Sequence, residues 1–184
     1  MAFFFVLIPF GTFAILMLVS NASISLLAAA TVSLAVIVSD RIRGRTLKML
    51  PVGSVALFAG LGCYIALVDN SWSGHTVRII IDGGLLVIAL ASLAIRLPFT
   101  LQYAREQVDA DIAQTPGFLR ANYILTLAWT LAFVAMLIAD ILAIYAPNVP
   151  LWVGLAIAFS ARNSAVYFTK WYAQYRRKHY APKA

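Results

Sequence analysis

The feature that most constrains this chain is a series of hydrophobic blocks, each close to the length that crosses a lipid bilayer as a helix. A bilayer core about 30 Å thick needs roughly 20 apolar residues of helix. Runs such as LLVIALASLAI do not alternate in polarity, as the strands of a membrane barrel do. Six blocks are present, at residues 3–19, 23–39, 51–68, 76–95, 121–145 and 150–170. We therefore predict an all-α integral membrane protein whose six transmembrane helices form three hairpins.

The composition supports the same class. Hydrophobic residues make up 62% of the 184 residues and charged residues 11%, whereas about a quarter of an average soluble domain is charged. We expect one transmembrane helical domain over residues 1–184. The first 39 residues carry no charge, and a cleaved signal peptide normally begins with a basic segment. The first block is therefore expected to be a retained span, with a cleaved signal as the alternative.

The distribution of positive charge predicts the orientation. Twelve of the fourteen Lys and Arg residues fall in the connections between hairpins and at the end of the chain. Because basic loops stay on the cytoplasmic side of a membrane, both termini are predicted to be cytoplasmic. The formal charge of +7 then faces anionic lipid headgroups rather than nucleic acid. In the basic tail, residues 171–184, the candidate headgroup contacts are Arg176, Arg177 and Lys178.

The connection at residues 97–120 begins with an aromatic, threonine-bearing and basic segment, LPFTLQYARE. A related pattern, YFTKWYAQYR, returns at residues 167–176. Tyr and Trp gather at the membrane–water boundary, so the pattern indicates two interfacial positions. Duplication of a hairpin is the alternative explanation. We expect residues 99–114 to form a short helix along the interface, or otherwise a solvated loop.

Ionisable and amide side chains inside the predicted spans are the candidates for function, because charges in a bilayer are costly and face the interior of a bundle. Asp82 lies in the fourth block and Asp140 in the fifth, and the sixth contains Arg162 followed by Asn163. With Asn122 they could line a path for an ion or an anionic solute. Polar contact between helices is the alternative.

Arg78 precedes Asp82 by four residues, so the two side chains can pair along one helix face. Gly83 and Gly84, directly after Asp82, would let another helix approach closely. Both observations favour a structural role for this part of the chain. Arg78, near the face opposite the basic connections, nevertheless belongs to the candidate path.

Patterns that identify an enzyme or a metalloprotein are missing from the sequence. It contains no HExxH, no GxSxG and no glycine-rich phosphate loop. The single cysteine, Cys63, has no intramolecular partner, and the two histidines have no other ligand types nearby. We predict no catalytic residues, no metal and no cofactor.

Three segments stand in an order that is characteristic of a known family: KMLPVGSVALFAGLGCYIALVDN, LASLAIRLPFTLQYA and TLAWTLAFVAMLIADILAIYAPNVPLW. Over residues 45–170 they resemble the intracellular septation protein A family of small bacterial inner-membrane proteins, best at Leu127-Ala128-Trp129 and at residues 145–150. The family more often has Asn near the position of Asp140 and has no counterpart of Arg162. The resemblance implies a multi-pass protein of the bacterial cytoplasmic membrane that takes part in septum or envelope organisation.

Three functions are therefore open. The resemblance implies a protein without catalysis that contacts other inner-membrane proteins. The charges within the spans indicate a small transporter or channel. The basic cytoplasmic face indicates a protein that binds anionic lipids. A bundle of this size often needs neighbours to enclose a solute path, so a homo-oligomer is compatible with the second function.

Overall fold

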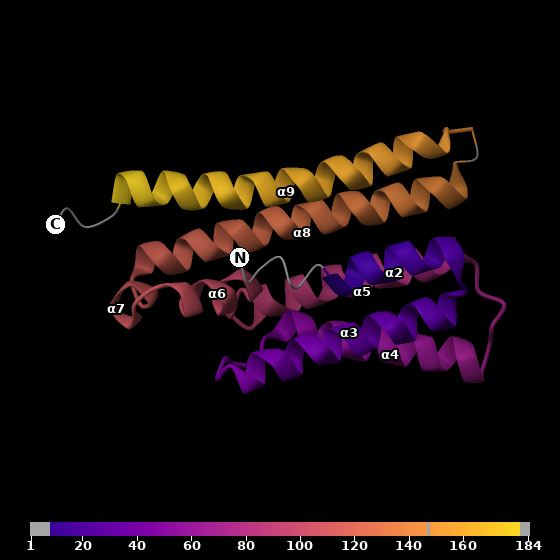
Figure 1. The fold of residues 1–184 in the computed structure, drawn as a ribbon. Helices are drawn as coiled ribbons and strands as arrows, with labels where there is room; N and C mark the ends of the chain where they lie inside the picture. The colour runs from indigo at the N-terminus through magenta and orange to yellow at the C-terminus, as the bar shows by residue number, and fades with distance from the viewer. Residues whose placement is uncertain (1–7, 147, 181–184) are drawn as a thin grey trace.

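The computed structural model of the protein describes residues 8–146 and 148–180, and within α9 it leaves the side chains of residues 151, 177, 179 and 180 undescribed. Over the described residues the chain folds into helices joined by turns, with no strand (Figure 1). The predicted all-α class is confirmed. In chain order the elements are α2 (Ile8–Val19), α3 (Ala22–Ile42), α4 (Met49–Leu67), α5 (Gly74–Ala94), α6 (Phe99–Ala104), η1 (Arg105–Gln107), α7 (Ala110–Ala113), α8 (Pro116–Tyr145) and α9 (Leu151–Tyr180).

Four of the described helices, α3, α4, α5 and α8, are long and apolar enough to cross a membrane. A helix suits this solvent because it satisfies its own backbone hydrogen bonds. α2 is apolar, but its described part is 12 residues long. α9 has 30 residues and carries both a central arginine and a basic end. A membrane protein is thus supported, while the count of six spans stays a prediction.

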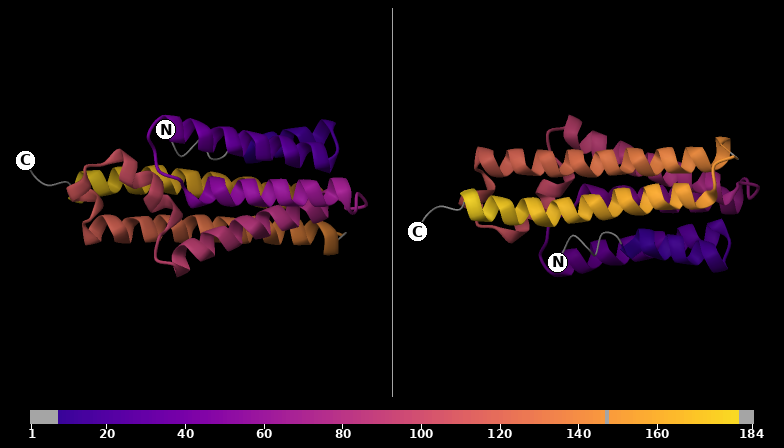
Figure 2. Two further views of the ribbon diagram at one scale, coloured as in Figure 1. Left: turned by 90° about the horizontal axis from the view of Figure 1, so that it is seen from below. Right: turned by 90° about the horizontal axis from the view of Figure 1, so that it is seen from above.

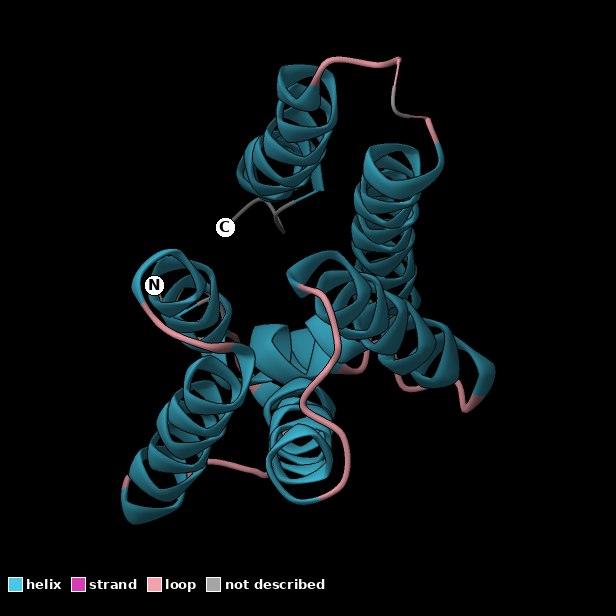
Figure 3. Cartoon of the chain, turned by 90° about the vertical axis from the view of Figure 1, so that its right-hand side faces the viewer, coloured by secondary structure: helices cyan, strands magenta, loops and turns pink. Residues whose placement is uncertain are grey.

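The long helices run antiparallel to their chain neighbours, so their connections gather at two ends of the bundle (Figures 1 and 2). One end holds residues 41–48, 96–120 and 170–180, and we call it the basic end because most of the Lys and Arg residues are there. The other end holds the connections at residues 20–21, 68–73 and 146–150, and we call it the far end. Figure 3 looks onto the far end and shows α9 beside α8, well separated from α3 and α4.

Several helices begin with a residue whose side chain caps the first turn. The side chains of Asn21, Ser73 and Thr115 accept hydrogen bonds from backbone N–H groups in the first turns of α3, α5 and α8. Such caps satisfy donors that have no partner within the helix. Pro116 stands in the first turn of α8, where its missing N–H costs nothing. The predicted boundaries move accordingly: α8 begins before residue 121, and α9 continues through the predicted tail as far as Tyr180.

Two apolar clusters hold the bundle together. The first joins α2, α3, α4 and α5 around Leu26, Phe58 and Val77, which are fully buried. The second joins α4, α5, α6, α8 and α9 around Phe99 and Trp129. α9 enters the second cluster through Ala165 and otherwise packs along α8. α8 therefore stands between α9 on one side and α5 and α6 on the other.

The segment after α5 differs from the prediction of an interfacial helix or a solvated loop over residues 99–114. It forms three short helices, and the side chains of α6 from Phe99 to Tyr103 are all buried. Their polar groups are satisfied inside the protein: the hydroxyl groups of Thr100 and Thr126 are 2.8 Å apart, and Thr100 Oγ1 donates to the Asn122 carbonyl. The solvated loop is therefore wrong for α6, because these bonds to α8 remove the need for water, while the position of this short helix relative to the membrane interface stays a prediction. The related segment at residues 167–176 instead lies within the continuous helix α9.

Close approach of helices depends on particular glycines. A Cβ on Gly84 would lie 2.6 Å from Leu57 Cδ2, whereas a Cβ on Gly83 would meet nothing within 4 Å. The predicted packing role is therefore confirmed for Gly84 and wrong for Gly83. In α4, a Cβ on Gly62 would lie 3.1 Å from Leu26 Cβ, while Gly60 faces open space. The small residue at Gly62 lets α3 and α4 approach each other.

Gly62→Val is expected to destabilise the protein relative to Gly60→Val. Both changes replace a glycine in the same helix, so the gain in helix propensity is shared, but only Gly62→Val forces branched atoms against α3. Overpacking of this kind typically costs about 1–3 kcal/mol. Thermal unfolding of the two variants in the same detergent measures the difference. Equal midpoints for the two variants would contradict the close α3–α4 contact.

Candidate functional site

A cavity of about 560 Å³ lies among α2, α5, α8 and α9. Its lining is mainly apolar, with one residue from the start of α4, Leu50. The lining residues are Phe10, Phe13, Ala14, Leu50, Arg78, Ile81, Asp82, Leu85, Trp129, Phe133, Met136, Asp140, Leu155, Ala156, Ala158, Phe159 and Arg162. Four of them are charged, and these four come from three different helices.

Two carboxyl groups meet in this cavity. Asp82 lies in the third turn of α5 and Asp140 in the second turn from the end of α8, and the two side chains interact directly. One carboxyl oxygen of Asp140, Oδ2, is buried and has no hydrogen-bond partner among the described residues. A buried polar atom without a partner is uncommon and needs an explanation, such as a ligand or water in the cavity.

Two guanidinium groups complete the charged lining. Arg78 lies one turn before Asp82 on α5, and Arg162 lies near the middle of α9; both attract the Asp82 carboxylate. Among the described residues, however, no nitrogen of Arg78 or Arg162 comes within 4.0 Å of an Asp or Glu carboxylate oxygen. The pairing expected between Arg78 and Asp82 is therefore a longer-range attraction, without a closed ion pair.

The apolar part of the lining is held by aromatic contacts. Trp129 and Phe133 pack on α8 with their ring centres 5.8 Å apart, and the Phe10 ring lies 5.0 Å from that of Phe58. Trp129 is only 1% exposed, and its Nε1 donates a hydrogen bond of 3.0 Å to Thr169 Oγ1. This bond joins α8 to α9 and fixes the indole at the edge of the cavity that faces the basic end.

The structure brings four of the predicted site residues together and leaves two outside. Arg78, Asp82, Asp140 and Arg162 line the cavity. The Asn163 side chain is exposed and donates to the Phe159 carbonyl of its own helix. Asn122 is 2% exposed and lies at the basic end of α8, where its Nδ2 donates to the Phe118 carbonyl. These two amides are local helix contacts, although Asn122 Oδ1 has no partner among the described residues.

The candidate lipid-headgroup residues lie on the last turns of α9. The Arg176 guanidinium lies against the first turn of α8, because a Cβ on Gly117 would be 2.8 Å from one of its nitrogens. The Lys178 side chain is exposed. The side chain of Arg177 is outside the described residues. Contact with lipid headgroups therefore stays a prediction for this face.

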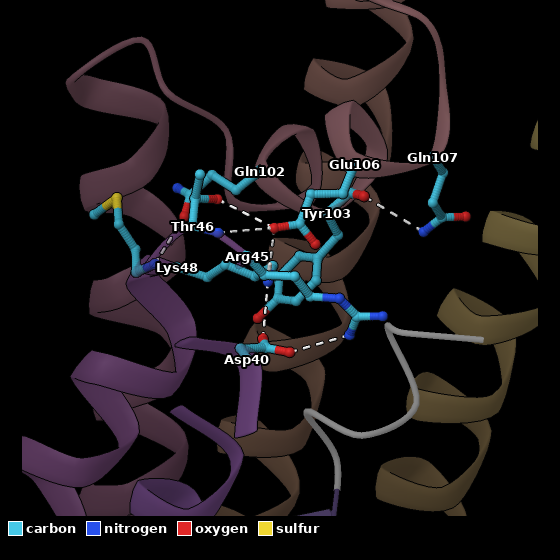
Figure 4. Close-up of polar contacts among 9 residues, drawn as sticks. Asp40, Arg45, Thr46, Lys48, Gln102, Tyr103, Glu106 and Gln107 are labelled. Atoms are coloured by element: carbon cyan, nitrogen blue, oxygen red, sulfur yellow. Dashed lines mark hydrogen bonds and ion pairs between the residues drawn. The ribbon is translucent and has the colours of Figure 1, made fainter. Parts of the chain in front are cut away.

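A second charged cluster, at the basic end, was not expected from the sequence (Figure 4). The Lys48 side chain is 1% exposed, and its ammonium group lies 2.8 Å from Asp40 Oδ2 and 3.1 Å from Glu106 Oε1. The same ammonium lies 5.2 Å from the centre of the Tyr103 ring. Arg45 adds an outer ion pair of 3.1 Å to Asp40. We call Asp40, Lys48, Tyr103 and Glu106 the Lys48 cluster.

Hydrogen bonds to the backbone extend the Lys48 cluster. Glu106 Oε1 accepts from both the backbone N–H and the hydroxyl of Thr46, and Gln102 Oε1 accepts from the backbone N–H of Met49 at 2.7 Å (Figure 4). Burial raises the pKa of the Tyr103 hydroxyl above its usual range, and the nearby charges of Asp40 and Glu106 add to this effect. Tyr103 therefore stays a neutral phenol beneath the Lys48 ammonium.

Two further observations limit the chemistry of the site. Among the described residues, no three His, Cys, Asp or Glu side chains gather where they could hold a metal ion. Searches with family models, curated proteins and solved structures found no match to this chain. The interpretation of the cavity therefore depends on its own geometry.

The meeting of Asp82 and Asp140 predicts a crosslink between α5 and α8. In a Cys63→Ser background, Asp82→Cys combined with Asp140→Cys is expected to react with a short bifunctional thiol reagent, because the two side chains interact. The matched control combines Asp82→Cys with Asn122→Cys on the same helix α8, roughly 27 Å from residue 140 at 1.5 Å per residue. Mass spectrometry of the intact protein reads out the crosslink. Equal yields for both pairs would contradict the geometry of the site.

Proposed function

We propose that the chain is a small multi-pass membrane transporter whose intramembrane cavity binds a charged organic solute. The observation that carries this proposal is that Asp82, Asp140, Arg78 and Arg162, from three helices, line one cavity. Cavities of about 300–1,000 Å³ are typical of sites for small molecules. Charged side chains within membrane helices commonly mark the path of a substrate or an ion.

The alternative in which these charges only hold helices together is less well supported. Polar groups that join helices pair with one another and leave no space between them. Here Asp140 Oδ2 has no partner among the described residues, and no ion pair within 4.0 Å joins the two arginines to the two aspartates. Asp82 and Asp140 do meet each other, but the two arginines close no ion pair with them, and all four side chains border a cavity of about 560 Å³.

The lining also favours one class of solute. Two carboxyl groups and two guanidinium groups face an otherwise apolar space that includes five aromatic side chains. A pure cation would meet two arginines, and a pure anion would meet two aspartates. A zwitterion with an apolar body can place its ammonium group near Asp82 and Asp140 and its anionic group near an arginine, because each charge then has an opposite partner.

The proposed membrane arrangement has six spans, with both termini on the cytoplasmic side of a bacterial inner membrane. Its support is that the basic connections lie at one end of the bundle, which is the end that the positive-inside rule places in the cytoplasm. The six spans consist of the four long apolar helices together with α2 and α9. Anionic lipids would then contact the basic end.

The sequence resemblance supports a different role, in septum or envelope organisation through protein partners. A protein that only contacts partners should tolerate Asp140→Asn, since this change keeps the size of the side chain. A transporter that uses the carboxylate should not tolerate it. The same variant therefore separates the two roles.

Binding of three probes with the same phenyl body tests the solute class: phenylalanine as zwitterion, phenethylamine as cation and 3-phenylpropanoate as anion. We expect phenylalanine to bind at least about tenfold more tightly than the other two, which corresponds to about 1.4 kcal/mol. Asp140→Asn should weaken phenylalanine binding by a similar factor. Titration calorimetry on purified protein in nanodiscs provides the affinities.

The control for this binding experiment is Asn163→Ala, since Asn163 lies next to Arg162 in sequence but does not line the cavity. Its affinity for phenylalanine should equal that of the unmodified protein. Absence of binding by all three probes would count against a small-molecule site for molecules of this size. A preference for the single-charge probes would retain the site but reject the zwitterion class.

The proposed orientation predicts the behaviour of fusion proteins expressed in bacteria. Green fluorescent protein fused after Ala184 should fluoresce, because it folds in the cytoplasm, and alkaline phosphatase fused at the same place should be inactive. A phosphatase fused within the far-end connection at residues 68–73 should be active. The opposite pattern would reverse the orientation, and two active phosphatase fusions would show an even number of spans between them.

A further inference from the structure

α6 lies between the cavity and the basic end of the bundle. Leu50, Leu85, Trp129 and Phe133 line the cavity, and all four belong to the same buried cluster as Phe99 and Tyr103 of α6. No residue of α6 lines the cavity itself. We call these four lining residues the floor of the cavity. α6 packs behind this floor, on the side that faces the basic end (Figure 1).

α6 is attached to two different parts of the bundle. On one side it is bonded to α8, through Thr100, Thr126 and the carbonyl of Asn122. On the other side it meets the end of α3 and the start of α4 through the Lys48 cluster and through Gln102, which accepts from the Met49 N–H. α6 and α8 thus form one side of a boundary and the start of α4 forms the other; we call this boundary the seam, and the Lys48 cluster bridges it.

Leu50 connects the Lys48 cluster to the lining of the cavity. It is two residues from Lys48 and is 2% exposed, and it belongs to the same apolar cluster as Trp129. A solute that leaves the cavity past α6 has to separate Leu50 on α4 from Trp129 on α8, which share one buried cluster. That separation would pull Lys48 away from Glu106, because Lys48 directly precedes α4, whereas Glu106 directly follows α6, which is bonded to α8.

We propose that α6 is the gate of the cavity at the basic end and that the Lys48 cluster holds this gate closed. The proposal rests on the proposed function, since it concerns access to the same cavity. A buried ammonium group is stable only while its partners remain in place, so the cluster favours the closed position. Asp40 and Glu106 are partly exposed, at 18% and 19% of their side-chain surfaces, so water can reach them when the seam opens.

The gate can be tested by the access of a reagent to the cavity, without any ligand. The full-length chain carries Cys63→Ser, which removes its exposed cysteine, and Met136→Cys, which places a thiol in the cavity lining. A membrane-impermeant maleimide is applied to sealed vesicles from the basic side. Labelling should be slow with the Lys48 cluster intact, and at least about tenfold faster with Lys48→Met or with Glu106→Gln.

Two features of the design keep the outcome interpretable. Glu106→Gln keeps an oxygen that can accept the bonds from Thr46 and removes only the charge, so it decides the test if Lys48→Met does not fold. Arg45→Gln is the matched control, because Arg45 pairs with Asp40 on the exposed side and does not contact the seam. Its labelling rate should equal that of the parent.

The gate is overturned if folded Glu106→Gln labels as slowly as the parent, or if Arg45→Gln accelerates labelling as much as Glu106→Gln. Labelling from the far side should be unchanged in every variant, and a parallel increase on both sides indicates general loosening and overturns the gate as well. Binding of phenylalanine is measured separately. If phenylalanine does not bind but labelling is faster in Glu106→Gln, the proposed function is rejected and the gate is retained. If phenylalanine binds but labelling is unchanged in Glu106→Gln, only the gate is rejected.

Discussion

Neutralisation of charge inside an apolar helical bundle is the constraint on which this structure depends. Water is scarce there, so a charged group must be matched by protein groups or must face a space that something else can occupy. The Lys48 ammonium is matched by Asp40, Glu106 and the face of Tyr103. The carboxyl of Asp140 is matched only in part. The Lys48 cluster thus satisfies this constraint with protein groups alone, whereas the carboxyl of Asp140 faces a cavity.

The Lys48 cluster also explains how a short segment becomes part of the core. α6 has six residues, too few to form a stable helix alone. It is held by Thr100 against α8 and by Gln102 and Tyr103 against the α3–α4 connection. Because these bonds come from two sides, α6 can bury Phe99 and close the floor beneath the cavity. The position of α6 beneath the cavity therefore depends on the bonds to α8 on one side and to the α3–α4 connection on the other.

The sequence was most informative where a pattern is local. The length of the hydrophobic blocks predicted the long helices, and charges within those blocks pointed to the four side chains that line the cavity. The convergence of Asp82, Asp140 and Arg162 depends on how α5, α8 and α9 are aligned, which no local pattern encodes. Lys48 was interpreted only as an orientation charge, because its partner Glu106 lies far along the chain. The burial of α6 was missed for the same reason, since it depends on Thr126 and Asn122 of α8.

The contrast between the two charged regions bears on function. This chain does complete its polar contacts where helices are to be joined: Thr100 and Thr126 bond to each other, Trp129 donates to Thr169, and Lys48 has two carboxylate partners. Ser33 Oγ and Asn122 Oδ1 are also buried without a hydrogen-bond partner among the described residues, but neither residue lines the cavity. The incomplete matching of Asp140 differs from theirs in its place, because it occurs at the cavity, where guanidinium groups face the carboxyl groups without closing on them. Such an arrangement leaves room for the opposite charges of a bound solute. The charged side chains of α5, α8 and α9 would then determine which solute binds.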